Sequence, residues 1–253
     1  MADATTLVGA QTQLPYSPAE AELIGGLKAL DQAAPTLNDE LWRKAIVLLD
    51  PECRAEYREQ FRQLRNRLVL YRDQVAGGAP LQVIAFLSAA RGDGKSFTSG
   101  NLAAALALAA KGKVLLLDAD PTSGRWHRRL EIDGDFGLSE VLAGGRWEDA
   151  VFPAPGLDLD LMPLGTARSS AIDRLDFHRL PAVLAELRAR YEWIIVDGPS
   201  FEDSADAELL GNLADGAMLV VKQDTVPFQK LQGFQKCLPE GKLLGVILNP
   251  GRG

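Results

Sequence analysis

The chain has few cysteines and no long apolar run, and these are the features that would mark a disulfide-rich, metal-ligating or membrane-spanning protein. Its 253 residues include two cysteines, Cys53 and Cys237, whose separation fits neither a disulfide framework nor a metal-ligand spacing. Reduced thiols in a cytoplasmic protein are therefore expected. No apolar run approaches the ~20 residues of a membrane helix, and the first residues lack the pattern of a signal peptide. We expect a cytoplasmic protein with no direct membrane span, recruited to the inner face of the membrane by a partner.

Positive charge is also in short supply. Lys and Arg number 27 against 34 Asp and Glu, which gives a formal net charge of −7. Proteins that bind nucleic acid usually present a basic surface, so no nucleic-acid partner is expected. A hydrophobic fraction of 47% and a charged fraction of 24% are ordinary for a globular protein and, at this length, predict one domain with an N-terminal extension.

The most informative feature that is present is a Gly-Lys-Ser loop at residues 94–96. An apolar run at 83–87 precedes it, and a helix-forming segment at 102–110 follows it. A phosphate chain binds where backbone N–H groups converge at a helix N-terminus, because the helix dipole favours negative charge there. In such a loop, Lys95 would reach the β- and γ-phosphates and Ser96 would ligate Mg²⁺.

The loop is a variant of the common phosphate-binding pattern. Gly92 and Gly94 allow a tight backbone turn, but Ala89 stands where the first glycine of G-x-x-x-x-G-K-[ST] is usual. Taken alone, the loop could also be a glycine-rich turn with a chance Gly-Lys-Ser sequence.

Two further apolar runs end in acidic residues. Residues 114–120 end in Asp118 and Asp120, and residues 191–200 contain Asp197 after a similar run. Parallel strands that are buried on both faces have continuous apolar runs, and ligands bind beyond the carboxyl ends of such strands. A single acid after a strand can equally be a helix cap or a turn residue. Three strand ends, one of which carries Gly-Lys-Ser, favour a nucleotide and Mg²⁺ site.

Strands and helices are expected to alternate along most of the chain. Strands are predicted near 82–88, 113–118, 158–163, 192–197, 216–222 and 243–249, and helices near 95–111, 173–190, 204–214 and 226–237. This alternation predicts an α/β fold, a doubly wound and mainly parallel sheet with helices on both faces.

An N-terminal helical extension is expected before the sheet. Residues 1–50 are predicted to form an arm with short helices, one of them near 17–30, and residues 51–253 the P-loop domain. A helix over 51–74 would carry Pro51 in its first turn. Its apolar positions recur at spacings of 4, 3, 4 and 3, which predicts a buried stripe formed by Tyr57, Phe61, Leu64, Leu68 and Tyr71.

Several motifs occur in a fixed order along the chain. They are the loop at 90–97 with Asn-Leu-Ala at 101–103, Asp-Ala-Asp at 118–120, Gly-Leu-Ser-Glu-Val-Leu-Ala-Gly at 137–144, Asp-Gly-Pro at 197–199 and Gly-Val-Ile-Leu-Asn at 245–249. On these motifs the chain resembles, from about residue 50 to residue 249, the bacterial tyrosine kinases (BY-kinases of the CpsD/CapB type) of exopolysaccharide and capsule synthesis. These are P-loop proteins related to the MinD/ParA ATPases.

The resemblance implies ATP and Mg²⁺ as cofactors. It places nucleotide binding on Arg91, Gly92, Asp93, Gly94, Lys95, Ser96, Phe97 and Asn249. It also implies that Ser96, Asp118 and Asp197 bind the metal ion. Lys95, Asp118 and Asp120 would be catalytic, with one of the two acids orienting or deprotonating the incoming phenol.

The resemblance also implies partners. Glu59, Arg62 and Arg65 match the E-x-x-R-x-x-R pattern by which family members join neighbouring subunits, so a homo-oligomer is expected. The same residues could instead form a solvated helix face with pairing between residues three apart. A membrane polysaccharide co-polymerase, which controls chain length, is the expected membrane partner.

The chain departs from the family pattern in two ways that bear on catalysis. Thr122 stands where the family has an arginine, and the tyrosine-rich tail of the autokinases has no counterpart after the last predicted strand. We expect Tyr57 and Tyr71 to be packed and Tyr191 to be buried at the start of a strand. Autophosphorylation should therefore be weak or absent, and confined to Tyr16 if it occurs.

Three functions remain open from the sequence. The first is an ATP-dependent protein-tyrosine kinase that acts with polysaccharide export machinery. The second is a catalytically weak, ATP-dependent assembly or regulatory relative, which the missing tail tyrosines and Thr122 favour. The third is a positioning ATPase of the MinD/ParA type, which ranks last because Ala90 occupies the place of the signature lysine of that group.

Overall fold

The computed structural model describes residues 37–74, 81–122, 125–132, 136–165, 178–223 and 225–251. All of them lie within one compact unit that spans residues 34–253. The helix predicted near 17–30 and the possible phosphoacceptor Tyr16 lie outside the described residues. No helix of the described part of the chain is long and apolar enough to cross a membrane.

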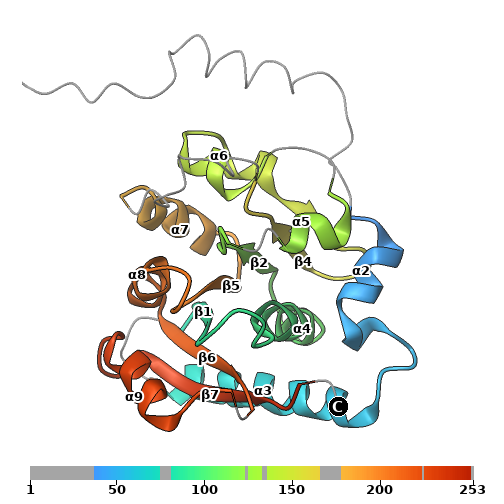
Figure 1. Ribbon diagram of the computed structural model, residues 1–253. Coiled ribbons are helices and arrows are strands. Elements are labelled where there is room, and N and C mark those ends of the chain that lie inside the picture. Colours follow the sequence, from blue (N-terminus) through green and yellow to red (C-terminus); the bar gives the residue numbers. More distant parts are fainter. Residues whose placement is uncertain are drawn as a thin grey trace, which may run out of the picture. The chain divides into compact units, whose positions relative to one another are not determined.

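A seven-stranded sheet forms the centre of this unit (Figure 1). Its strands are β1 (Val83–Ser88), β2 (Val114–Asp118), β3 (Phe152–Pro153), β4 (Leu159–Met162), β5 (Trp193–Ser200), β6 (Gly216–Lys222) and β7 (Leu243–Asn249). The spatial order is β3-β4-β2-β5-β1-β6-β7. All neighbours are parallel except β3, which runs antiparallel to β4. The six strands predicted from the sequence are confirmed, and only the two-residue β3 is new.

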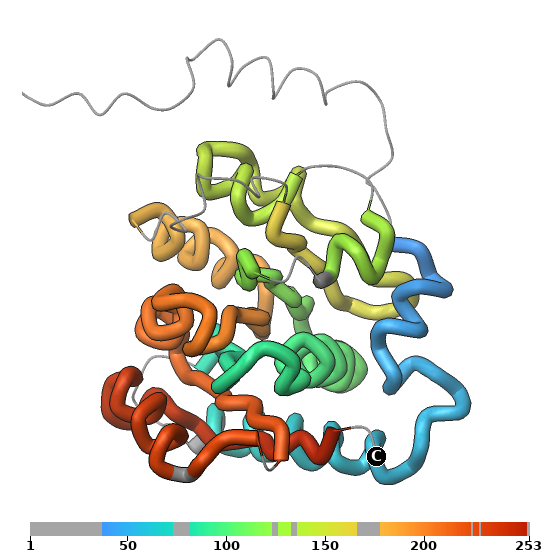
Figure 2. The backbone as a smooth tube through the Cα atoms, in the orientation of Figure 1, coloured from blue at the N-terminus to red at the C-terminus, as the bar shows by residue number. Residues whose placement is uncertain are grey.

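The chain path brings three strand ends together. The chain passes from β1 to β2 through a helix, and β5 later inserts between those two strands (Figure 2). Because all three are parallel, their carboxyl ends lie at one edge of the sheet, which is where ligands bind in such folds. The loop after β1 is therefore next to the acidic residues at the ends of β2 and β5.

Helices cover both faces of the sheet, as the doubly wound prediction requires. They are α2 (Asp39–Ala45), α3 (Ala55–Gln74), α4 (Lys95–Ala107), α5 (Arg125–Leu130), α6 (Leu138–Leu142), α7 (Leu180–Arg188), α8 (Asp206–Leu213) and α9 (Phe228–Lys236), with short 3₁₀ turns η1 (Val47–Leu49) and η2 (Trp147–Ala150). Helices α2 to α5 lie on one face and α6 to α9 on the other (Figure 1). Strand β1 serves both cores, because Val83 and Leu87 pack on one face and Phe86 on the other. The fold class predicted from the sequence is confirmed.

Helix α3 differs from its predicted form at its start. It begins at Ala55, and Pro51 lies in the turn before it rather than in its first turn. Asp50 explains the later start: its carboxylate accepts the Glu52 N–H at 2.8 Å, and its carbonyl accepts a bond from the Arg58 guanidinium at 2.6 Å. These bonds hold residues 50–54 in a turn, so helical pairing starts only afterwards.

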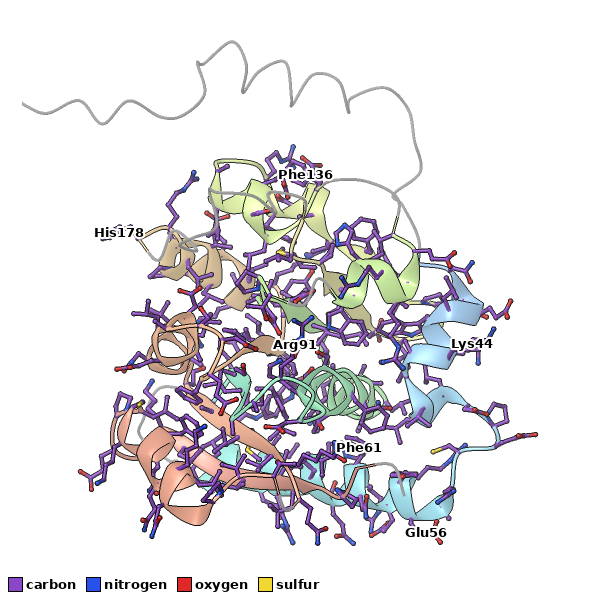
Figure 3. The ribbon with its side chains drawn as sticks, viewed as in Figure 1. Lys44, Glu56, Phe61, Arg91, Phe136 and His178 are labelled. Carbon is purple, nitrogen blue, oxygen red and sulfur yellow. The ribbon has the colours of Figure 1, made fainter. Side chains whose placement is uncertain are left out.

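The buried stripe of α3 also differs from the prediction. Phe61 and Leu68 are buried as expected, and the Phe61 ring, labelled in Figure 3, lies 6.1 Å from the Phe97 ring of α4. Tyr71, however, is 43% exposed, so the prediction that it is packed is wrong. Arg72 takes the inward position instead and stacks over Trp193 with its guanidinium carbon 4.2 Å from the ring centroid. Tyr71, one residue earlier, is therefore turned toward solvent.

Residues 37–49 pack against the domain rather than extending from it. Asn38 caps α2 by accepting the N–H groups of residues 40 and 41. Trp42 is fully buried, with its ring centroid 6.3 Å from that of Trp126 in α5. The Leu48 N–H donates to the Asn101 side chain of α4 at 3.1 Å. This segment joins the core that covers the α4 face of the sheet.

Candidate nucleotide-binding site

The loop between β1 and α4 needs glycine at two positions. Gly92 and Gly94 have φ angles of 90° and 96°, in the left-handed region that other residues rarely adopt. A Cβ atom on Gly94 would also lie 2.1 Å from the Asn249 amide nitrogen. Helix α4 starts directly after, at Lys95. Its first N–H groups, which have no partner within the helix, therefore lie at the loop and could bind an anion there.

Asp93 and Asn249 hold the loop in shape. The Asp93 carboxylate accepts the Ala90 N–H at 2.9 Å, and the Asn249 amide donates to the Asp93 carbonyl at 2.8 Å. Asn249 in turn accepts the Gly251 N–H. The last strand, β7, is thus tied to the phosphate loop, although 156 positions separate Asn249 from Asp93.

Two other residues of the predicted nucleotide set lie differently. Arg91, in the loop that precedes α4, is exposed (Figure 3), and its place in the nucleotide set remains a prediction. The Phe97 ring is directed at Phe61 of α3, on the flank of α4. Only the backbone of Phe97 is available for a phosphate, because its side chain belongs to the packing between these two helices.

Lys95 is paired with Asp120 in the interior. Its ammonium group lies 3.0 Å from Asp120 Oδ2, and both side chains are more than nine-tenths buried. Thr122 occupies the other oxygen, through its hydroxyl at 2.6 Å and its N–H at 3.0 Å. Burial alone would raise the pKa of Asp120, but Lys95 and Thr122 outweigh it and hold this pKa below its usual range. Both oxygens of Asp120 thus have partners.

Asp118 and Asp197 form the most unusual pair in the site. They lie opposite each other on β2 and β5, and both are fully buried. Asp118 Oδ1 accepts the Asp120 N–H at 3.2 Å, and Asp197 Oδ2 accepts the indole N–H of Trp126 at 2.9 Å. The second oxygen of each, Asp118 Oδ2 and Asp197 Oδ1, has no hydrogen-bond partner among the described residues. Buried polar atoms are rarely left in this way.

The electrostatics of the pair follow from its burial. Burial first, and then the neighbouring Asp197 carboxylate, raises the pKa of Asp118 well above its usual value. Burial also raises the pKa of Asp197, against the lowering effects of the nearby Lys95 ammonium and Ser96 hydroxyl and of the hydrogen bond from Trp126. A hard cation with oxygen ligands would relieve both unpaired oxygens, so the residues present fit Mg²⁺.

The protein alone does not form a closed metal cage here. Among the described residues no group of three or more His, Cys, Asp or Glu side chains could hold a metal ion. This agrees with the coordination of Mg²⁺ in phosphate-binding sites, where one or two carboxylates act together with substrate phosphates and water. Ser96, Asp118 and Asp197 would supply such an open set of ligands.

Trp126 and Thr122 were not predicted as parts of this site. Trp126 contacts Asp197 across 71 positions of sequence, and no local pattern marks such a contact. In the sequence Thr122 stands out only as a departure from the family pattern, although it supplies two of the bonds to Asp120.

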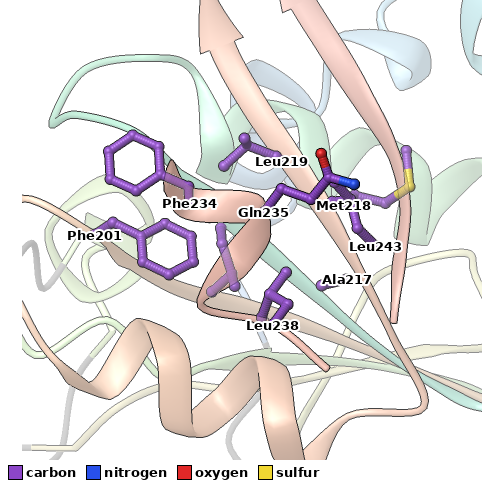
Figure 4. A pocket seen from close by; sticks show the side chains of 9 residues that line it. Phe201, Ala217, Met218, Leu219, Phe234, Gln235, Leu238 and Leu243 are labelled. Atoms are coloured by element: carbon purple, nitrogen blue, oxygen red, sulfur yellow. The ribbon is translucent and has the colours of Figure 1, made fainter. Parts of the chain in front are cut away.

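An apolar cleft lies elsewhere, on the α9 face of the sheet (Figure 4). Phe201 and Phe234 stack there with ring centroids 4.9 Å apart. Apart from Gln235 its lining is apolar: Leu87, Phe201, Ala217, Met218, Leu219, Phe234, Leu238 and Leu243. The cleft has no titratable lining residue and is separate from the phosphate loop.

The site and the sheet together define a class of protein. A parallel sheet, a glycine loop that leads from β1 into the N-terminus of α4, a buried lysine and carboxylates at two neighbouring strand ends are the features of a P-loop nucleotide-binding protein.

Comparison with known proteins gives the family. Residues 81–249 match the model of the family described as cellulose biosynthesis protein BcsQ. The chain is 30% identical over 210 residues to tyrosine-protein kinase YwqD of Bacillus subtilis (strain 168), covering 82% of this chain and 86% of that protein. It is 29% identical over 231 residues to the succinoglycan biosynthesis transport protein ExoP of Rhizobium meliloti (strain 1021), covering 89% of this chain but only 28% of that longer protein.

A solved structure agrees. The BceF tyrosine kinase domain superposes with a TM-score of 0.68 at 25% identity, covering 94% of this chain and 99% of that domain. The chain therefore belongs to the bacterial tyrosine kinase family within the MinD/ParA-like P-loop ATPases. The resemblance read from the motifs is confirmed.

Proposed function

We propose that this chain binds ATP with Mg²⁺ at the loop before α4 and acts as a protein-tyrosine kinase that regulates exopolysaccharide polymerisation and export. The two unpaired, buried oxygens of Asp118 and Asp197, at strand ends next to the Lys95 loop, carry this proposal. The names of the relatives, which include tyrosine kinases and a succinoglycan transport protein, support the reaction class and the setting. A membrane co-polymerase at the inner face of the membrane is the proposed partner.

The residues divide the work according to their surroundings. Lys95 and the loop N–H groups would bind the phosphates, while Ser96, Asp118 and Asp197 would hold Mg²⁺ directly or through water. The bound ion would neutralise charge on the phosphates during transfer. Asp118, at the end of β2 beside the proposed metal position, would also orient the phenol or accept its proton. Asp120 has a lowered pKa and two occupied oxygens, and would instead position Lys95.

Transfer of labelled phosphate from ATP to a poly-(Glu,Tyr) peptide tests the proposal. We expect Mg²⁺-dependent transfer by the wild-type protein and at least about a hundredfold less by Asp118→Asn, which matches the usual contribution of a general base. Mg·ATP binding without transfer to peptide or protein would instead identify the alternative, a catalytically weak assembly protein. The local observation that favours this alternative is Thr122, a neutral residue beside Asp120.

We expect autophosphorylation to be weak, and we expect none at Tyr191. Tyr191 is buried, and its hydroxyl donates to Asp160 at 2.7 Å, so its phenol cannot reach the loop without local unfolding. Tyr71 is the exposed tyrosine of the described residues and joins Tyr16 as a possible acceptor. Phosphosite mapping after incubation with Mg·ATP measures which tyrosines are phosphorylated. The Tyr71→Phe variant serves as the comparison. Strong labelling of Tyr191 would contradict the packing argument.

A homo-oligomer that uses α3 is part of the proposal. Glu59 and Arg62 form an exposed pair on this helix, with an N–O distance of 2.7 Å. Arg65 is half-buried and donates to the Asn66 side chain of the same helix and, at 3.5 Å, to the Ala105 carbonyl of α4. Arg62 is therefore the better probe of a subunit contact, because a change at Arg65 would also disturb the fold.

Arg62→Glu should shift the protein toward the monomer and leave its ATP affinity unchanged, because the Arg62 side chain is exposed and pairs with Glu59 of the same helix rather than with a residue of the loop. Light scattering with ATP measures the mass. Arg67→Glu, the same charge reversal at an exposed position of the same helix, is the matched control and should change neither property. Equal masses for wild type and Arg62→Glu would show that Glu59 and Arg62 form only a solvent-exposed ion pair and make no subunit contact.

A further inference from the structure

Trp126 joins the acidic strand end to the helices that cover it. Its indole N–H donates to Asp197 Oδ2 at 2.9 Å, and the tryptophan and the aspartate are 1% and 0% exposed. The bond leaves Asp197 Oδ1 without a partner among the described residues. Asp197 Oδ2 is thus fixed by a hydrogen bond from the protein, and Oδ1 is available for a ligand.

The indole is confined from two sides. A Cβ atom on Gly100 of α4 would lie 2.4 Å from the edge of the Trp126 ring, so the helix that starts at Lys95 makes room for this ring by having a glycine there. On the side of α2, the Trp42 ring centroid lies 6.3 Å from that of Trp126, at an angle of 41° between the rings. A ring confined in this way presents its N–H in one direction.

We propose that Trp126 is a positioning residue for the metal site: its indole N–H fixes the plane of the Asp197 carboxylate and leaves Oδ1 for Mg²⁺ or one of its water ligands. The inference rests on the proposed Mg²⁺-nucleotide function. A carboxylate turns easily about its last bond, and a buried donor on one oxygen removes that freedom. Loss of such an outer hydrogen bond typically lowers metal affinity about 10- to 100-fold.

The chain offers a matched control for this test. Trp42 is also fully buried, but its indole N–H has no hydrogen-bond partner among the described residues. Trp126→Phe and Trp42→Phe therefore remove the same ring atoms from the same part of the core, and only Trp126→Phe removes a bond to Asp197. Thermal melting compares the stability of the two variants.

The decisive quantity is the Mg²⁺ concentration that half-saturates ADP binding, measured by calorimetry at one pH. We expect it to rise about tenfold in Trp126→Phe and to stay at the wild-type value in Trp42→Phe, with ADP affinity in EDTA equal for all three proteins. Equal values for Trp126→Phe and wild type, or equal shifts in both variants, would overturn the inference while the proposed function stands. Wild-type protein without Mg²⁺-dependent binding would overturn both.

A second measurement needs no folded variant at position 126. The chain has four tryptophans, so a ¹H–¹⁵N spectrum of the wild-type protein contains four indole N–H signals, and Trp42→Phe identifies that of Trp42. Addition of Mg²⁺ to the ADP-saturated protein should shift a slowly exchanging indole signal that is not that of Trp42. If no indole signal moves while Mg²⁺ still raises ADP affinity, Trp126 does not act on the metal site.

Discussion

Replacing Lys95 with methionine should lower the affinity for Mg·ATP about 10- to 100-fold, because hydrogen bonds to charged groups contribute about 1.5–3 kcal/mol. Methionine keeps the length of the side chain and removes its charge. Binding of a fluorescent ATP analogue measures the effect. Lys95 is buried against Asp120, so the variant should also lose stability through an unpaired buried carboxylate.

The effect on binding must be separated from the effect on the fold, and Lys113 allows this. Lys113 also pairs with a buried carboxylate, that of Asp160, at 2.7 Å. It lies just before the start of β2, at the opposite end of the strand from Asp118. Lys113→Met should therefore lose stability and keep its ATP affinity. Equal loss of affinity in both variants, or none in Lys95→Met, would contradict the proposed phosphate-binding role of Lys95.

Asp118→Asn should make the protein more stable at neutral pH while it abolishes the Mg²⁺ dependence of nucleotide binding. The pKa of Asp118 is raised above its unfolded value of 3.8, chiefly by burial. The folded state therefore binds more protons than the unfolded state above about pH 4, and stability falls as the pH rises. Asparagine removes the charge, and we expect a gain of about 1–3 kcal/mol, the usual penalty for a buried group without a partner.

Urea unfolding at pH 5 and pH 8 checks the sign, because the advantage of Asp118→Asn should be larger at pH 8. Asp160→Asn is the control. Asp160 is also buried, on the neighbouring strand β4, with one oxygen unpaired, but its other oxygen bonds Lys113 and Tyr191. Its replacement should destabilise the protein, since it breaks an ion pair. An Asp118→Asn variant less stable than wild type at pH 8 would contradict the view that this carboxylate is held in place for a cation.

A functional role would explain why the chain has a buried carboxylate, Asp118, that destabilises the fold. An acid that destabilises the fold persists where its charge is used, and perturbed pKa values cluster at functional sites for that reason. Asp118 and Asp197 share this property, whereas Asp120 and Asp215 have lysine or arginine partners that lower their pKa. The raised pair therefore supports the proposed position of the metal and the nucleotide at the ends of β2 and β5.

The sheet and the loop can be predicted from the amino-acid sequence, because their signals are local. Continuous apolar runs indicate β1, β2 and β5, and Gly-Lys-Ser after β1 predicts an anion site. The parallel alternation then placed the acidic residues at one edge of the sheet. Family motifs added the nucleotide set, including Asn249.

The pairing of the side chains, in contrast, depends on how the helices and the sheet pack together. The direction of Tyr71 depends on Arg72 stacking over Trp193, and the inward position of Arg65 depends on where α4 lies. The bond from Trp126 to Asp197 joins the short helix α5 to a strand end 71 positions away. Such contacts have no period or spacing along the chain, because they are set by the packing of whole helices against the sheet.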